Sequence, residues 1–146
     1  MAGDTFRDAF RAELTSVVSA AGIAWPVRDL INTAENPDAS GGFIAIEFLG
    51  GSEEQFTTGA PGDNLFRENG QVTIRVYAPQ EGSVTTRDQA ERYAEAIRVA
   101  FRGRRFACGA DRTIRIDGTQ PMGGGQDEAG LWAEAIGLGY EMFNTG

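Results

Sequence analysis

The segment from Arg67 to Phe101 constrains the fold more than any other part of the chain. Its first part alternates between polar and apolar residues with the period of two that a half-buried strand requires. The apolar face of this strand would carry Val72, Ile74, Val76 and Ala78. Pro79 cannot donate to a strand ladder and ends the strand, and a helix with a capping box begins at Thr85 or Thr86. The segment is therefore a strand–turn–helix scaffold without a catalytic pattern.

The rest of the chain predicts one more helix and several more strands. Apolar residues at spacings of three and four predict a helix from Thr5 to about Ala20, and Gly22 would end it. Further strands are expected at Phe43–Leu49, Gln55–Thr58, Arg112–Ile116 and Leu131–Phe143. Gly50 and Gly51 would close a hairpin between the first two of these strands.

Two segments rich in glycine and polar residues, Gly59–Asn69 and Gly118–Gly130, predict long mobile loops. The order of the elements predicts an α+β fold, because most strands are adjacent in sequence and one helix crosses between them. We expect a mixed, mainly antiparallel sheet of about four or five strands, with two helices packed on one face. The length of 146 residues predicts a single domain over residues 1–146.

The residue types that the chain lacks exclude most catalytic chemistry. It contains no His, which excludes Ser-His-Asp catalysis and imidazole metal sites. It also contains no Lys, which excludes Schiff-base catalysis and a P-loop. Its single cysteine, Cys108, is interpreted as a small buried hydrophobe. Asp127 and Glu128 lie in a glycine-rich segment without the rigid cleft that paired carboxylates need. We therefore predict no enzymatic activity, no catalytic residue, no cofactor and no metal site.

Charge and hydropathy limit the partners. A net charge of −8 and a pI near 4.5 argue against a nucleic-acid ligand. No apolar run approaches the roughly 20 residues that span a bilayer, and no signal peptide opens the chain, so no membrane partner is expected. The local exception is the basic group Arg98, Arg102, Arg104 and Arg105 near the end of the second helix. These arginines either complement the helix dipole or dock an acidic protein surface.

The last strand has one face made of small residues. Between Ala133 and Gly139 this face carries alanine and glycine at every second position, ending in Gly137 and Gly139. Such a face suggests close approach by another backbone or helix.

Several of these segments together resemble phage tail-terminator-like proteins, the small minor tail proteins of long-tailed phages. The resemblance rests on the first helix, the strand Phe43–Leu49, Gln55–Gly59, Arg67–Gly70, the strand ending Val76–Pro79, Ala90–Phe101, and Trp132 with Tyr140. It covers roughly Thr5 to Phe143, and its motifs are structural. The chain departs from the family pattern in Arg28–Gly42 and in Gly118–Gly130.

The resemblance implies a structural virion protein. It would form a homo-hexameric ring that caps the head-proximal end of the tail tube, ends tube polymerisation and presents a joining surface to the head connector. The implied partners are other copies of the chain, the tail tube protein and the head–tail connector or stopper protein. DNA would pass through the ring without specific binding, and assembly would take place in the host cytoplasm.

The interface residues that we expect on this interpretation are Arg98, Arg102, Arg104, Arg105, Phe66, Arg67, Gly137 and Gly139. Two other interpretations stay open. One is a head-completion or neck protein of the head–tail interface, which binding to tube tips would distinguish. The other is a small α+β ligand-binding domain, which a deep polar pocket would favour.

Overall fold

A computed structural model describes residues 4–29, 41–55, 57, 65–79, 84–109, 112–126 and 131–145. Within this part of the chain there are two helices and six strands. In chain order they are α1 (Asp4–Ala20), β1 (Val27–Asp29), β2 (Phe43–Gln55), β3 (Leu65–Tyr77), α2 (Val84–Phe101), β4 (Arg105–Cys108), β5 (Arg112–Gln126) and β6 (Trp132–Thr145). The fold is α+β, and both predicted helices lie where the sequence pattern placed them.

The strands form one sheet in the order β1-β2-β3-β6-β5-β4. β1 runs parallel to β2, and every other pair is antiparallel, so the sheet is mixed and mainly antiparallel as predicted. The predicted number of four or five strands was too low, because the described residues form a sheet of six. The two additional strands, β1 and β4, lie at the edges and span three and four residues. Runs this short show too little alternation to be recognised in a sequence.

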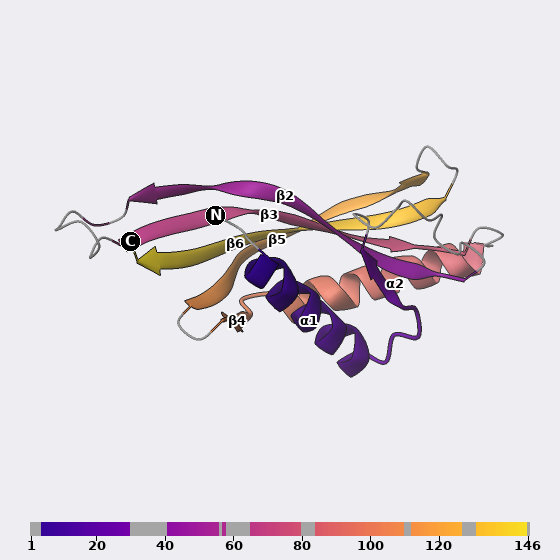
Figure 1. The fold of residues 1–146 in the computed structure, drawn as a ribbon. Coiled ribbons are helices and arrows are strands. Elements are labelled where there is room, and N and C mark those ends of the chain that lie inside the picture. The colour runs from indigo at the N-terminus through magenta and orange to yellow at the C-terminus, as the bar shows by residue number, and fades with distance from the viewer. Residues whose placement is uncertain are drawn as a thin grey trace.

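Both helices pack on the same face of the sheet (Figure 1). The predicted stripe of α1 supplies Phe6, Phe10 and Leu14 to the core, each at most 1% exposed. Phe10 stacks on Phe101 of α2, with ring centroids 5.7 Å apart. The inward residues of the sheet are mainly Ile44, Ile46, Val72, Ile74, Val76, Ile114, Ile136 and Leu138. This face is called the inner face below, and the opposite one the outer face.

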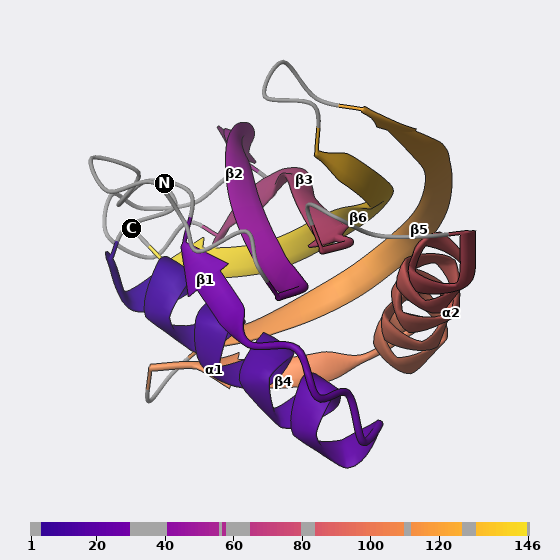
Figure 2. The same ribbon diagram turned by 90° about the vertical axis from the view of Figure 1, so that its right-hand side faces the viewer.

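The sheet curls around the helices, and α1 lies between the β1 and β4 edges (Figure 2). Three irregularities in strand register accompany this curl. One lies in β2 between Phe48 and Gly51, and two lie in β5, between Ile116 and Gly118 and between Pro121 and Gly123. Each inserts one extra residue, and such bulges bend a strand and increase its twist. At the first bulge, Gly50 has a φ of 81°, which a residue with a side chain rarely adopts.

The predicted hairpin at Gly50–Gly51 was therefore wrong. β2 continues through the bulge to Gln55, and the strand that returns beside it is β3. Double glycine signals a turn and a bulge equally well, because both need backbone angles that favour glycine.

The predicted loops were also too long. Residues 65–69 belong to β3, and residues 118–126 belong to β5, where they pair with β6. The ladder hydrogen bonds come from the backbone, so glycine-rich sequence can join a strand when a neighbouring strand provides the partner. Residues 59–64 and 127–130 lie outside the described part of the chain.

Two hairpins lie at opposite ends of the sheet (Figure 1). At one end β2 and β3 project, and residues Gly51 to Gln55 of β2 are exposed. At the other end β5 and β6 project, and most of β5 after Ile116 is exposed. These two projections give the molecule an elongated shape.

Candidate interaction surface

The structure gives no support to a catalytic centre among its described residues. In that part of the chain, no three His, Cys, Asp or Glu side chains are placed to hold a metal ion. Cys108 is buried in β4, and burial raises the pKa of its thiol, which makes it a poor nucleophile. Asp127 and Glu128 lie outside the described residues.

The four arginines expected to form one basic group face different neighbours. Arg98 pairs with Glu95 on α2, which raises the pKa of the guanidinium, and its Nη1 donates to Thr119 Oγ1 of β5 at 3.4 Å. Arg104 Nε donates to Glu13 of α1. Arg102 is exposed at the end of α2, and Arg105 is exposed on β4. Arg98 and Arg104 therefore join elements within the chain, which leaves Arg102 and Arg105 as the exposed members.

Phe66 and Arg67 are neighbours in sequence that lie on opposite faces of β3. Phe66 is half-buried on the inner side. Arg67 lies on the outer face, where it pairs with Glu54 of β2 and lies 3.8 Å from Glu141 of β6. They do not form one site.

Gly137 and Gly139 lie on the outer face of β6 and are half-buried. A Cβ on Gly139 would lie 2.8 Å from Asp117 Oδ1, and one on Gly137 would lie 3.4 Å from Met122 Sδ. Asp117 and Met122 are the extra residues of the two β5 bulges. In the described chain this small face lies beside side chains of β5, and the approach of another backbone or helix stays a prediction.

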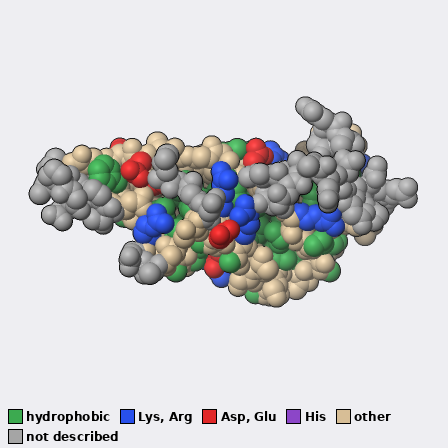
Figure 3. Space-filling view, viewed as in Figure 1, with side chains coloured by type: hydrophobic (Ala, Val, Ile, Leu, Met, Phe, Trp, Pro, Cys, Tyr) green, Lys and Arg blue, Asp and Glu red, His purple; other side chains and the backbone are tan. Residues whose placement is uncertain are grey.

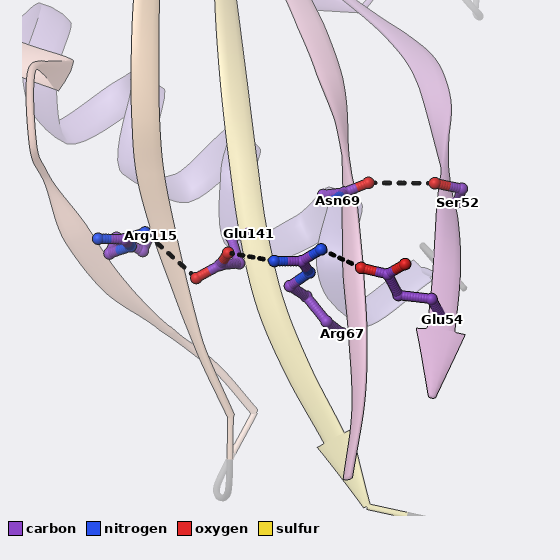
Figure 4. Close-up of polar contacts among 6 residues, drawn as sticks. All are labelled: Ser52, Glu54, Arg67, Asn69, Arg115 and Glu141. Atoms are coloured by element: carbon purple, nitrogen blue, oxygen red, sulfur yellow. Dashed lines mark hydrogen bonds and ion pairs between the residues drawn. The ribbon is translucent and has the colours of Figure 1, made fainter. Parts of the chain in front are cut away.

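The polar feature that the sequence did not indicate is a row of charges across the outer face (Figure 4). Its members are Glu54 of β2, Arg67 of β3, Glu141 of β6 and Arg115 of β5. Arg115 Nη2 lies 3.2 Å from Glu141 Oε1, and Ser52 Oγ donates to Asn69 Oδ1 at 3.1 Å beside the row. Figure 4 shows the guanidinium of Arg67 between the two carboxylates, so the charges alternate from strand to strand. We call these four residues the charge row.

Arg105 extends the charge row at its β4 end. It lies directly opposite Arg115 in the strand register, so two cations are neighbours there. An open hollow of about 380 Å³ is lined by both arginines together with Thr113, Glu141 and Phe143. The β4 end of the row is therefore basic, whereas its β2 end carries Glu54.

A second polar group lies under the β2 bulge on the inner face. Tyr140 O–H donates to Glu68 Oε2 at 3.3 Å, and both residues are 1% exposed. Burial, followed by the charge of Glu68, raises the pKa of Tyr140 to about 12. A pocket of about 340 Å³ lies beside Glu68 and is lined by Arg7 and the bulge. The sequence does not indicate this pair, because Glu68 falls in a segment whose composition predicts a loop.

The signs of charge are mixed over the rest of the visible surface. On the face drawn in Figure 3, arginines and acids are interspersed along the middle of the molecule, and neither sign forms one continuous area. No helix in the described residues is long and apolar enough to cross a membrane.

A family model described as "Phage tail terminator protein" matches residues 5–140. The match covers both helices, β1 to β5 and most of β6. Among curated proteins, no sequence matches the chain.

Proposed function

The chain belongs to the phage tail terminator family, a family of structural virion proteins, and from this premise we propose that it caps the tail tube. In this proposal six copies form a ring at the head-proximal end of the tube. The ring stops the addition of tube subunits and presents its other side to the head connector. The observation that carries the proposal is the family match over residues 5–140.

The shape of the chain supports this role. A ring forms when two different surfaces of one subunit bind each other and the rotation closes. The two projecting hairpins, at opposite ends of the sheet, provide different surfaces on different sides of the molecule (Figure 1). A sheet packed on two helices gives the subunit a rigid frame, which fixes the rotation between neighbours.

The charge of the chain suits a channel for DNA. With a net charge of −8, the ring would hold few phosphates, and DNA could slide through it. A strongly basic channel would retain DNA in a salt-dependent manner.

The proposal is tested by adding the purified chain to growing tail tubes. Electron microscopy should show a six-fold ring at one end of each tube, and tube growth should stop at that end. Binding to the head connector without binding to tube ends would instead indicate a neck protein and would contradict the proposal.

A further inference from the structure

Among the described residues the sheet has two strand edges without a neighbouring strand, one at the end of β2 and one at β4. The β2 edge is acidic, and the β4 edge is basic. Among the described residues, Ser52–Gln55 of β2 pairs with β3 alone, because β1 pairs with β2 only at Ile44–Ile46. β4, at the other side of the sheet, pairs with β5 alone. The β2 edge contains Glu53 and Glu54, and the β4 edge begins with Arg105 after Arg104. Exposed strand edges of this kind are sites where another chain can add a strand.

The two edges lie at the same level along the strands. The register links Ser52 to Asn69, Asn69 to Glu141, Glu141 to Arg115 and Arg115 to Arg105. Four antiparallel steps separate β2 from β4, so the two strands have the same sense within the curled sheet. Copies related by a rotation can therefore place β4 of one beside the Ser52–Gln55 segment of β2 of the next.

The pattern of charges is incomplete at the β4 end. From Glu54 to Arg115 each charge has an opposite neighbour, but Arg105 faces Arg115, and like charges directly opposite each other are destabilising. In the described chain Arg105 has no ion-pair partner. The Glu54 side chain is 57% exposed although it pairs with Arg67, so it can contact a second cation.

We propose that neighbouring copies in the ring join at these edges, with Glu54 of one copy entering the hollow between Arg105 and Arg115 of the next. The alternation of charges then continues from one subunit to the next. Phe143, which is 36% exposed at the hollow, would be covered at the same time. This inference rests on the proposed ring, and it names the surfaces that form it.

Charge reversal tests the contact. Arg105→Glu and Glu54→Arg should each lower the fraction of tube ends that carry rings by about tenfold at a fixed, subsaturating protein concentration. The double variant should recover most of this loss, because the pair is restored with its signs exchanged. Arg92→Glu is the matched control: it makes the same change of charge at an exposed position on α2 and should leave ring formation unchanged. Thermal unfolding of each variant shows whether the fold is retained.

The outcomes separate the two proposals. Tube ends without rings in the wild-type chain would overturn the proposed function. Wild-type rings that persist in Arg105→Glu, or a double variant no better than either folded single variant, would overturn the edge contact alone. Duplex DNA binding that Arg105→Glu abolishes, with rings intact, would assign the hollow to phosphate and would also overturn it.

Discussion

At the scale of single residues, the positions that tolerate least change are those where backbones approach each other. A Cβ on Gly70 would lie 2.4 Å from the carbonyl oxygen of Gly50 and 2.6 Å from the Cα of Gly51. The same Cβ would lie 2.9 Å from the hydroxyl of Tyr140. Gly139, by contrast, meets the end of the Asp117 side chain, which can move away. Gly70, opposite the β2 bulge, is therefore required for packing more strictly than Gly137 and Gly139, the glycines expected at an interface.

Gly70→Ala should destabilise the protein by about 1–3 kcal/mol, because the backbone of the bulge would have to shift. Gly118→Ala is the matched control, since no atom lies within 4 Å of a Cβ there and its φ lies outside the left-handed region. It should change stability by less than about 1 kcal/mol. Chemical denaturation measures both, and equal stabilities of the two variants would contradict this account of the bulge.

Because the pKa of Tyr140 is raised, we expect the stability of the protein to depend on pH in the alkaline range. This pKa rises from 10.0 to about 12 in the folded chain, so the folded state keeps a proton that the unfolded state releases. The stabilisation is complete below pH 10 and should be lost as the pH rises towards 12. In Tyr140→Phe this part of the decline should disappear when unfolding is followed between pH 9 and 12. A phenolate absorbance difference between wild type and variant that develops near pH 10 would contradict the assignment.

At the scale of elements, the helices and the long inner strands could be predicted from sequence, and the edges could not. α1, α2, the middle of β3 and β6 have uninterrupted apolar periodicity over many residues, and the structure confirms them. β5 has no such pattern, because its two bulges change which residues face the core. The charge row was not predictable either, since Glu54, Arg67, Arg115 and Glu141 meet only through the register of separate strands.

Phe10 is the side chain through which the two helices and β4 pack together. It is 0% exposed, stacks on Phe101 of α2 and meets Phe106 of β4 edge to face at 5.2 Å. Phe10→Ala should therefore cost about 3–5 kcal/mol in the free energy of unfolding. Phe143→Ala, at an exposed position, is the control and should cost much less in the isolated chain. A loss below about 1 kcal/mol for Phe10→Ala would show that α1 contributes little to the core.

At the scale of the whole molecule, the fold provides a rigid frame with a different surface on each side. The helices fill the inner face, the charge row crosses the outer face, and the hairpins extend at the two ends. The basic residues that a nucleic-acid interface needs are instead largely joined to acids within the chain, as Arg75 is to Glu47 and Arg104 to Glu13. This arrangement suits contacts between proteins better than contacts with phosphate.

The purified chain should therefore bind duplex DNA weakly at low salt, with little dependence of the affinity on salt concentration. Fluorescence anisotropy of a labelled duplex between about 20 and 200 mM salt measures this. Tight binding with a steep salt dependence would contradict the distribution of charges described above and would require a basic surface.

The bulges of β5 also change which of its residues face the helices. Even-numbered residues such as Ile116 face the helices before Asp117, odd-numbered ones such as Thr119 do so between the bulges, and even-numbered ones do so again from Gly124. The second bulge thus cancels the phase shift of the first. A deletion of Met122 alone would leave residues 123–126 opposite the same residues of β6, because the extra residue of a bulge has no partner in the register. If both Asp117 and Met122 were removed, residues 118–121 would keep their partners on a flatter strand. Either extra residue can therefore be gained or lost without changing the pairing of the rest of β5 with β6. Because bulges bend a strand, the curvature of the sheet can change in evolution without rebuilding the core.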